Sequence, residues 1–575
     1  MTMRLRLTAA MLLGLLAQPA LAEDAKGDWT GALVVTPTAS LRLAVHIQAG
    51  PNGTLTGTLD SLDQNARGIP LADIRATPDT LAFTVPAVNG SYAGTWDEAK
   101  KAWVGQWSQG GRALALSLAR GETPPALPPP SPLPADWTIP SDAAIAAIID
   151  DRIAGRPGEG IVIGIVDANG RRIVAGGPNG APALDARTLF EIGSLTKVFT
   201  ATILADMAAR GEVRLDDPVA KYLPAGTRIP ERGGRRITLL DLATHRSGLP
   251  RLSANMPLGD LANPYADYTE TMMFDFLAGH ELTRDIGSQF EYSNLGFGLL
   301  GHALARRAGT DFATLVADRI LKPLGMDDTS IALSPGQRAR FATPHDEYMR
   351  PTSPWDLPAL PGAGALRSTA DDMLNFLSAQ IGLAATPLSP AMQVAVDRKG
   401  QAPATGLSWF LSQPSGRIIP WHGGGTGGFR TAMAYDPVKK RGVVVLTNAA
   451  VEPAADDIAM HLLLGAPISP NRPVPPAPAP VPARTAVALP VAELDRIVGR
   501  YALRPNLTME VVRRGVGVVA GMVGSPALPI FPEAPLRFFW RTVNAVATFT
   551  ADADGKVTGV TVVQDGQTYT GRRLD

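Results

Sequence analysis

The chain of 575 residues contains no cysteine. Disulfide bonds, thiolate metal sites, cysteine nucleophiles and a lipid-modified amino-terminal cysteine are therefore excluded. The chain also lacks an excess of charge of either sign, because Lys plus Arg and Asp plus Glu both number 53. This balance provides no electrostatic attraction for nucleic acid or an anionic membrane, so neither is expected as a partner.

Long hydrophobic runs are missing as well. A membrane-spanning helix needs about 20 apolar residues, and the run Leu7–Leu16 is too short to be one. It follows Arg4 and Arg6 and precedes an Ala-Leu-Ala site that ends at Ala22, which is the order of a secretory signal peptide. We therefore expect cleavage after Ala22, a periplasmic or secreted mature protein, and no transmembrane anchor.

Proline and glycine are abundant, at 51 and 58 residues, and proline gathers in two segments. Proline-rich segments stay extended and act as semi-rigid spacers. With 45% hydrophobic and 18% charged residues the chain is typical of a globular protein, and it is too long for one hydrophobic core. The expected division is a signal peptide (1–22), an N-terminal domain (23–121), a linker (122–140), a central domain (141–466), a second linker (467–488) and a C-terminal domain (489–575).

Both terminal domains show the pattern of β-strands. LRLAVHI, TLAFTVP and ALALSLA alternate apolar and polar residues in the N-terminal domain, as half-buried strands do. In the C-terminal domain, VATFTADADGKVTGVTVVQ predicts two strands joined across Asp554-Gly555. We expect a small all-β domain at each end of the chain.

The central domain mixes helical and strand patterns. SDAAIAAIIDDRIAG predicts a helix capped by Ser141, with isoleucines at helical spacing. IVIGIVDANGRRIVAGG predicts a hairpin over Asn169-Gly170, and Val443–Asn448 a buried strand. The central domain is therefore expected to be α+β and to carry the chemistry.

The segment FEIGSLTKVFTATILADMAARG holds Ser194 and Lys197 as an S-x-x-K pair at the start of a helical pattern that ends at Gly211. Helical spacing places both side chains on one face, one turn apart. A lysine can activate a serine only if its pKa falls from about 10.4 toward about 7–8. The amino end of the helix also offers free N–H groups to an oxyanion. Alone, this four-residue match is better explained by a capped surface helix.

Two later segments carry the groups that an activated serine needs. Tyr292-Ser293-Asn294 precedes a helical pattern, and His422-Gly423-Gly424 precedes a strand-like one. A phenol beside Ser194 can share the proton transfer, and the Asn294 amide can orient an acyl carbonyl. Glycines on a strand allow close approach of a substrate. The Gly425 N–H can then be a second oxyanion donor, whose loss costs about 10²–10³ in rate.

In this order the three motifs resemble those of the serine β-lactamase and penicillin-recognising superfamily. The resemblance is narrower to its class C-type branch, with family VIII esterases and D-aminopeptidases. LLDLATHRSGLP, GLLGHALARRAG and PGAGALRSTADDMLNFL also match, so the resemblance covers about residues 141–465. It implies an antiparallel sheet flanked by helices. The terminal β domains resemble those attached to such hydrolases, and the last one is lipocalin-like.

The resemblance implies a role for each matching residue. Ser194 would form the acyl-enzyme with Lys197 as its base, and Tyr292 would relay the proton to the leaving group. How Lys197 and Tyr292 divide the proton transfer stays open. The groups placed against the substrate would be Asn294, His422, Gly424 and Gly425, with the Ser194 and Gly425 N–H groups holding the oxyanion. No metal and no cofactor is implied.

One position departs from the pattern of the family. β-Lactamases usually carry Lys-Thr-Gly where this chain has His422-Gly423-Gly424. Histidine, with a reference pKa of about 6.5, is mostly neutral at pH 7, and glycine has no hydroxyl. Recognition of a substrate carboxylate by this motif should weaken. The departure favours a carboxylesterase or a D-amino-acid-directed peptidase over a β-lactamase.

Two other features of the sequence suggest different functions. His245 is a candidate triad histidine, but no G-x-S-x-G segment exists to supply its serine, so a structural role is expected. Gly423–Gly428 fits a dinucleotide-binding pattern, but no helix follows it. A β-lactamase and a non-catalytic binder of penicillin or peptidoglycan remain as alternatives. The expected partner is a small-molecule or peptide substrate, and the sequence does not indicate an oligomeric state.

Overall fold

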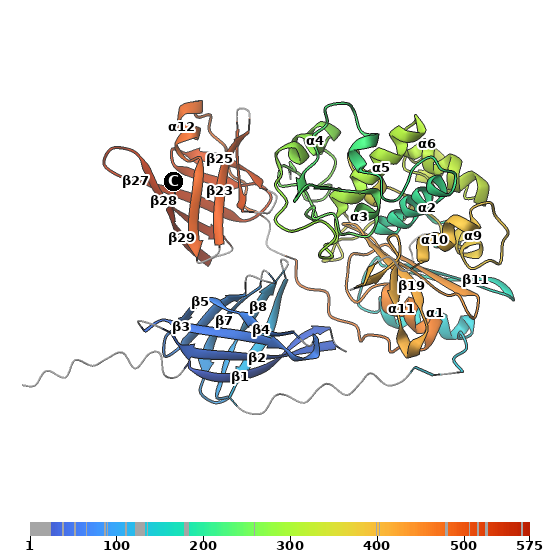
Figure 1. Cartoon of the computed structure of the whole chain (residues 1–575), viewed down its shortest axis with the longest axis horizontal. Coiled ribbons are helices and arrows are strands. Elements are labelled where there is room, and N and C mark those ends of the chain that lie inside the picture. Colours follow the sequence, from blue (N-terminus) through green and yellow to red (C-terminus); the bar gives the residue numbers. More distant parts are fainter. Residues whose placement is uncertain are drawn as a thin grey trace, which may run out of the picture. The chain divides into compact units, whose positions relative to one another are not determined.

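The computed structural model describes most of the chain from residue 25 to residue 574 (Figure 1). Not described within this range are residues 37–38, 51–52, 65, 86–87, 89, 110–111, 121–132, 135, 178–182, 258, 398–399, 402, 478–480, 505–506, 515–516, 524–526 and 565–566. The expected signal peptide and most of the first linker lie outside the described residues. The chain divides into two compact units, with the boundary after residue 132.

The N-terminal unit is a nine-stranded antiparallel sheet (blue in Figure 1). Its edge strands β4 and β5 are consecutive in the chain and separated only by Leu71, whose N–H donates to the Gly57 carbonyl of β3 at 2.9 Å. One nearly continuous segment therefore joins both edges, which makes the sheet barrel-like. The strands are β1 (Gly27–Thr36), β2 (Ala39–Ala49), β3 (Leu55–Ser61), β4 (Ala66–Pro70), β5 (Ala72–Ala76), β6 (Thr80–Val85), β7 (Gly90–Asp97), β8 (Ala102–Gln109) and β9 (Arg112–Ala119).

The central region is built on an eight-stranded sheet in the order β11-β10-β21-β20-β19-β18-β17-β16. Every neighbouring pair is antiparallel. The predicted hairpin and the predicted buried strand are confirmed as β10–β11 and β21. The bounds are β10 (Ile161–Asp167), β11 (Gly170–Gly176), β16 (Gly400–Gln401), β17 (Ala404–Thr405), β18 (Phe410–Ser412), β19 (Ile419–Gly425), β20 (Arg430–Asp436) and β21 (Arg441–Thr447).

Helices cover both faces of this sheet. Ile163 of β10 packs with α1 (Asp142–Ile153) and α11 (Asp456–Leu464), whereas its neighbour Val162 packs in the core of the larger helical layer. Successive side chains of a strand point to opposite faces, so a strand between two helical layers must be apolar throughout. Ser141 caps α1 as predicted, because its side chain accepts the Ala144 N–H.

The larger helical layer holds the elements that surround the site. The helices are α2 (Thr196–Ala209), α3 (Leu239–Ala243), α4 (Glu270–Gly279), α5 (Asn294–Ala308), α6 (Phe312–Val316), α7 (Pro335–Arg338), α8 (Pro361–Gly364), α9 (Ala370–Gln380) and α10 (Ser389–Val396). Two short pairs of antiparallel strands accompany them: β12 (Phe190–Glu191) pairs with β15 (Arg367–Ser368), and β13 (Glu231–Arg232) forms a hairpin with β14 (Arg235–Arg236). All residues of α2 from Thr196 to Met207 are buried, so this helix is the centre of the layer.

The C-terminal region is a closed eight-stranded barrel. The predicted hairpin across Asp554-Gly555 is confirmed as β27–β28. The sequence pattern gave no sign of a helix here, but a short one, α12 (Val491–Arg496), precedes the barrel and adds Leu494 to its core. The strands are β22 (Gly499–Arg504), β23 (Leu507–Arg514), β24 (Gly517–Met522), β25 (Leu528–Ala534), β26 (Arg537–Trp540), β27 (Ala545–Ala551), β28 (Val557–Gln564) and β29 (Gln567–Arg573).

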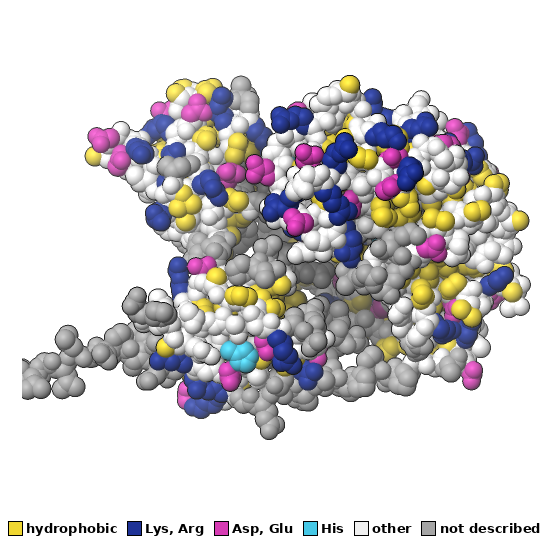
Figure 2. Space-filling model, in the orientation of Figure 1, with side chains coloured by type: hydrophobic (Ala, Val, Ile, Leu, Met, Phe, Trp, Pro, Cys, Tyr) yellow, Lys and Arg dark blue, Asp and Glu magenta, His cyan; other side chains and the backbone are white. Residues whose placement is uncertain are grey.

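The surface shown in Figure 2 carries acidic and basic side chains interspersed with each other, so the described residues form no patch of one sign on this face. This distribution agrees with the equal numbers of acidic and basic residues. Within the described ranges, none of the helices has both the length and the apolar character needed to cross a bilayer.

Candidate active site

Ser194 lies in a 3-10 turn, Gly193–Leu195, between β12 and α2. We call this segment the serine turn. The sequence pattern placed Ser194 in the long helix itself, but α2 begins only at Thr196. Gly193 has a φ of +51°, and this left-handed conformation redirects the chain before the helix. Ser194 is half-buried and can meet a substrate, whereas Lys197, one turn later, is 0% exposed.

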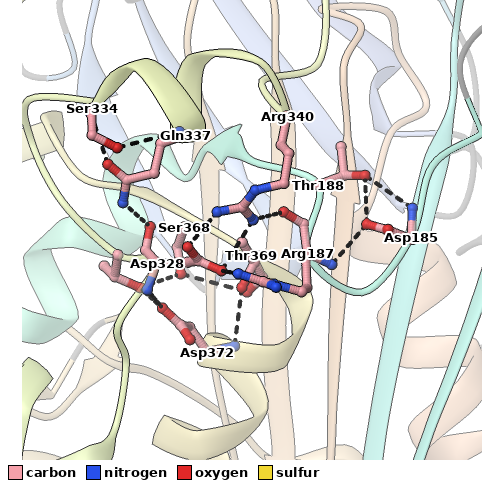
Figure 3. A network of polar contacts seen from close by, with 11 residues as sticks. Asp185, Arg187, Thr188, Asp328, Ser334, Gln337, Arg340, Ser368, Thr369 and Asp372 are labelled. Atoms are coloured by element: carbon pink, nitrogen blue, oxygen red, sulfur yellow. Dashed lines mark hydrogen bonds and ion pairs between the residues drawn. The ribbon is translucent and has the colours of Figure 1, made fainter.

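A polar network holds the strand that enters the serine turn (Figure 3). Asp328 accepts hydrogen bonds from Arg187 at 3.1 Å and from Arg340 at 3.0 Å. Its own N–H donates to the carboxylate of Asp372, on α9, at 3.0 Å, and Thr329 donates to the same carboxylate at 2.7 Å. Because Arg187 lies just before β12, the network ties this strand to α9 and to the segment around Asp328.

The Lys197 amine has three hydrogen-bond partners. Its Nζ lies 3.0 Å from Ser194 Oγ, 2.9 Å from Asn294 Oδ1 and 2.7 Å from the Ala363 carbonyl oxygen. These groups come from the serine turn, the first residue of α5 and the helix α8. Three elements that are distant in the sequence therefore meet at one nitrogen.

The surroundings of Lys197 favour its neutral form. Burial lowers its pKa well below the usual value, and the positive charge of Arg251 lowers it further. A neutral amine has two N–H groups and one lone pair. The oxygens of Asn294 and Ala363 can only accept, so they take the two N–H groups, and the lone pair is left for the Ser194 hydroxyl. This is the arrangement of a general base on a serine nucleophile.

Tyr292 lies at the entrance to α5, two residues before the helix begins. Ser293 caps this helix, because its Oγ accepts the Gly296 N–H at 2.9 Å and donates to the Pro250 carbonyl at 2.7 Å. The Tyr292 phenol is a hydrogen-bond partner of Ser194, and burial raises its pKa to about 12. At neutral pH the phenol is therefore protonated and has a proton to pass on.

The Asn294 amide is held at both ends by protein groups. Its Oδ1 accepts from Lys197 Nζ, and its Nδ2 donates to the Tyr265 hydroxyl at 3.3 Å. The amide therefore orients the lysine amine. The contact with a substrate that the sequence pattern indicated for Asn294 stays a prediction.

His245 stacks on the Tyr292 ring and also binds the backbone on both sides of Tyr292. The two rings stack with centroids 4.3 Å apart and an interplanar angle of 28°. His245 Nδ1 accepts the Ser293 N–H at 3.0 Å, and the His245 carbonyl accepts the Glu291 N–H at 2.8 Å. The backbone of His245 is left-handed, with a φ of +58°, a conformation that the surrounding contacts must hold. His245 thus has a positioning role at the site.

The strand β19 approaches the serine turn backbone to backbone. A side chain added at Gly193 would place its Cβ 2.7 Å from Gly425 N, and one added at Gly424 would lie 2.2 Å from the Ile192 carbonyl oxygen. Both distances are shorter than any real Cβ contact, so only glycine fits at either position. The Gly425 backbone thus lies against the serine turn, where an oxyanion would need its second donor.

His422 is a neutral hydrogen-bond acceptor at this edge of β19. Burial and the nearby Lys197 lower its pKa to about 3. Its Nδ1 lies 2.6 Å from the Gly423 carbonyl oxygen. A carbonyl can only accept, so Nδ1 carries the ring proton and Nε2 keeps a lone pair. The imidazole therefore supplies no positive charge for an anionic group of a substrate.

The structure brings the predicted residues Ser194, Lys197, Tyr292 and Asn294 into one hydrogen-bonded group, and places His422–Gly425 along its edge. Sequence patterns missed two contributors: the carbonyl of Ala363 and the guanidinium of Arg251. Both lie in or next to segments that resemble the family, but a backbone carbonyl leaves no side-chain signal. In the part of the chain that the structure describes, no three His, Asp or Glu side chains gather in a way that could hold a metal ion.

At this site a buried amine is hydrogen-bonded to a serine hydroxyl that also contacts a phenol. The site lies between a helical layer and an antiparallel sheet. This combination defines a serine hydrolase of the S-x-x-K class. A sequence profile of the Beta-lactamase family matches residues 145–466, which is more than half of the chain. The chain therefore belongs to the Beta-lactamase family, within the serine β-lactamase and penicillin-binding-protein superfamily, and its fold class is the one expected from the motifs.

Among its relatives is the D-alanyl-D-alanine-carboxypeptidase/endopeptidase AmpH of Escherichia coli K12, which is 34% identical over 339 residues, 54% of this chain and 85% of AmpH. A beta-lactamase of Pseudomonas fluorescens is 28% identical over 318 residues, 48% of this chain and 84% of that protein. Among solved structures, a beta-lactamase/D-alanine carboxypeptidase from Yersinia pestis complexed with citrate is 28% identical, with a TM-score of 0.48, covering 54% of this chain and 94% of that chain.

Proposed function

We propose that this hydrolase is a D-amino-acid-directed peptidase that works through an acyl-enzyme on Ser194. The observation that carries the proposal is the 3.0 Å contact between Lys197 Nζ and Ser194 Oγ, with both N–H groups of the neutral amine taken by carbonyl oxygens. The likeness to AmpH, a D-alanyl-D-alanine carboxypeptidase/endopeptidase, supports the substrate class.

In the proposed reaction Ser194 Oγ attacks the carbonyl carbon of the scissile amide and passes its proton to Lys197 Nζ. The negative charge that develops on the carbonyl oxygen is held by the N–H groups of Ser194 and Gly425. When the carbon–nitrogen bond breaks, Tyr292 gives its phenolic proton to the leaving nitrogen and regains one from Lys197. The product is a serine ester, which water then hydrolyses to release the acid and restore the hydroxyl.

A carboxylesterase is the second candidate, and the neutral His422 favours it. The neutral imidazole cannot replace the charge of the lysine that the third motif lacks. Binding of a β-lactam, which carries a carboxylate, should therefore weaken more than binding of an uncharged ester. The same acyl-enzyme serves both reactions. The leaving group alone distinguishes them.

The test has a labelling step and a substrate step. A fluorophosphonate probe should label the wild type at Ser194, identified by peptide mass spectrometry, and should leave Ser194→Ala unlabelled. The wild type is then given an acyl-D-Ala-D-Ala peptide, a p-nitrophenyl ester and a chromogenic cephalosporin. Release of D-alanine with slow cephalosporin turnover supports the proposal, whereas fast cephalosporin turnover with an inert peptide refutes it. A protein that takes no label is a binder, not a hydrolase.

The proposal includes export. Residues 1–22 have the order of a signal peptide. Amino-terminal sequencing of the mature protein from a cell fraction should find Glu23 first. A mature protein that keeps Met1 and stays in the cytoplasm would contradict this part.

A further inference from the structure

Arg251 is anchored to the helix that carries the site. Its carbonyl oxygen accepts the N–H groups of Asn294 at 3.0 Å and Leu295 at 3.2 Å, the first two residues of α5. The preceding Pro250 carbonyl accepts from Ser293, the cap of the same helix. The backbone of Arg251 is therefore fixed relative to Tyr292.

The side chain of Arg251 combines a position at the site with exposure. Its guanidinium carbon lies 5.1 Å from the centroid of the Tyr292 ring. The residue is nonetheless exposed, and among the described residues no acidic side chain forms an ion pair with it. The positive charge of Arg251 acts on groups inside the site. It contributes to lowering the pKa of Lys197 and His245, and it partly offsets the increase that burial causes in the pKa of Tyr292. An arginine held this way, with no carboxylate partner among the described residues, has its hydrogen-bond donors available to a ligand.

The role of Tyr292 indicates which part of the substrate lies beside Arg251. The phenol gives its proton to the leaving nitrogen, so the group attached to that nitrogen must lie beside Tyr292. In a peptide that ends in a D-amino acid, this group carries a carboxylate only two bonds from the nitrogen. The guanidinium next to the phenol is thus on the side where that carboxylate has to be.

Three other basic side chains lie at the site, and none is suited to bind this anion. Arg430, beside Gly425, is already paired with Glu452 at 3.2 Å and donates to two backbone carbonyls. Lys197 has to be neutral to accept the Ser194 proton, and its N–H groups are already bound. His422 is neutral and presents a lone pair. Arginine, in contrast, stays charged and offers a planar pair of donors that matches a carboxylate.

We propose that Arg251 is the specificity-determining residue that binds the carboxylate of the leaving group, so that the preferred substrates are peptides and esters whose leaving group ends in a free carboxylate. The proposal rests on the proposed acyl transfer at Ser194 and makes it more specific. In this proposal Arg251 recognises the substrate carboxylate, which in β-lactamases is recognised by the lysine and threonine that the third motif lacks here.

The experiment removes the charge from the enzyme and from the substrate separately. The substrates are the acyl-D-Ala esters of 3-hydroxybenzoic acid and of 3-hydroxybenzamide, which share one acyl group and differ in one charge. The wild type should prefer the carboxylate ester by roughly 30-fold in kcat/KM, as expected for a charge-assisted pair. Arg251→Ala should lose this preference, because its kcat/KM should fall much more for the carboxylate ester than for the amide ester. Arg251→Lys, which keeps the charge but not the planar fork, should retain part of it.

The control is Arg236→Ala, another exposed arginine that has no ion pair among the described residues and that lines a different pocket. It should keep the full preference. An unchanged preference in Arg251→Ala overturns the proposal, as does equal use of both esters by the wild type.

The same comparison made with acyl-D-Ala-D-Ala and its C-terminal amide separates the two proposals. If the esters show the Arg251-dependent preference but neither peptide is cleaved, the peptidase assignment fails and the role of Arg251 stands. Equilibrium binding of the two peptides to Ser194→Ala and to Ser194→Ala/Arg251→Ala gives a readout without turnover. In that assay the acid should bind more tightly than the amide only while Arg251 is present, and equal affinities overturn the role of Arg251.

Discussion

Replacing Lys197 by methionine should stop hydrolysis and at the same time change how the stability of the fold depends on pH. The side chain is completely buried and its pKa is lowered by that burial, so the folded protein holds the amine neutral. Removing the proton from a lysine with a reference pKa of about 10.4 at pH 7 costs about 4.6 kcal/mol, at about 1.36 kcal/mol per pH unit. Methionine has a similar length and no proton to lose, so it avoids this cost.

The substitution also removes two hydrogen bonds, from Nζ to Asn294 Oδ1 and to the Ala363 carbonyl. Methionine leaves both oxygens buried without a donor, at a cost of about 1–3 kcal/mol each, so the two effects are of similar size at pH 7 and their pH dependence is the quantity to measure. Between the lowered pKa of the folded state and the usual pKa of the unfolded state, the unfolded chain binds one proton more than the folded one. Wild-type stability therefore rises with pH by about 1.4 kcal/mol per unit relative to the variant. The stability of Lys197→Met relative to the wild type should therefore fall steadily as pH rises through this range.

Urea unfolding of both proteins at about pH 6.5, 7.5 and 8.5 measures this difference directly. Lys221→Met is the control, because Lys221 is an exposed lysine paired with Asp217. It should be slightly destabilising by the same amount at all three pH values. If Lys197→Met is instead less stable than the wild type by a constant amount, the amine is charged in the fold, and its assignment as the base is refuted.

Three further substitutions test the groups around this amine. Tyr292→Phe should lower kcat for an amide by about 10²–10³ and for a p-nitrophenyl ester by much less, since a good leaving group needs no proton; equal losses would contradict a relay to the leaving group. His245→Asn tolerates the left-handed backbone but removes the ring stacked on Tyr292, so kcat should fall about tenfold with little change in KM, and a change in KM alone would speak against positioning. Gly193→Ala should lower kcat by about 10² or more because its Cβ would lie 2.7 Å from Gly425 N, whereas Gly211→Ala, also at positive φ but with no atom within 4 Å, should only lower the melting temperature.

Much of the fold follows from local patterns. Strands of two-residue period, such as β2 and β6, and the capped amphipathic helix α1 are specified by neighbouring residues, and the structure confirms them. The hairpins β10–β11 and β27–β28 were likewise predicted from their turn residues. The short helix α12 was missed because six residues carry too little periodicity to distinguish a helix from a loop.

The site was predictable only in part, for a physical reason. Ser194, Lys197, Tyr292 and Asn294 sit in short motifs whose chemistry can be recognised before any fold is known. Their mutual distances, in contrast, depend on where the chain folds back. The left-handed His245 lies 47 positions from Tyr292 in the sequence, and its stacking on that ring leaves no trace in either segment.

The replacement of a lysine by His422 removes a cation from the third motif, and the structure shows how Lys197 keeps a lowered pKa without it. Burial is the larger cause of the shift and the charge of Arg251 is the smaller one. If a substrate carboxylate neutralises Arg251, only the smaller contribution is offset, and the buried amine stays a base while the substrate is bound. A permanent charge at the exposed mouth of the site can therefore recognise an anion without setting the protonation state of the amine beneath it. Anion recognition and base strength are thus separated between two residues, Arg251 and Lys197, and each can be changed by substitution without removing the other.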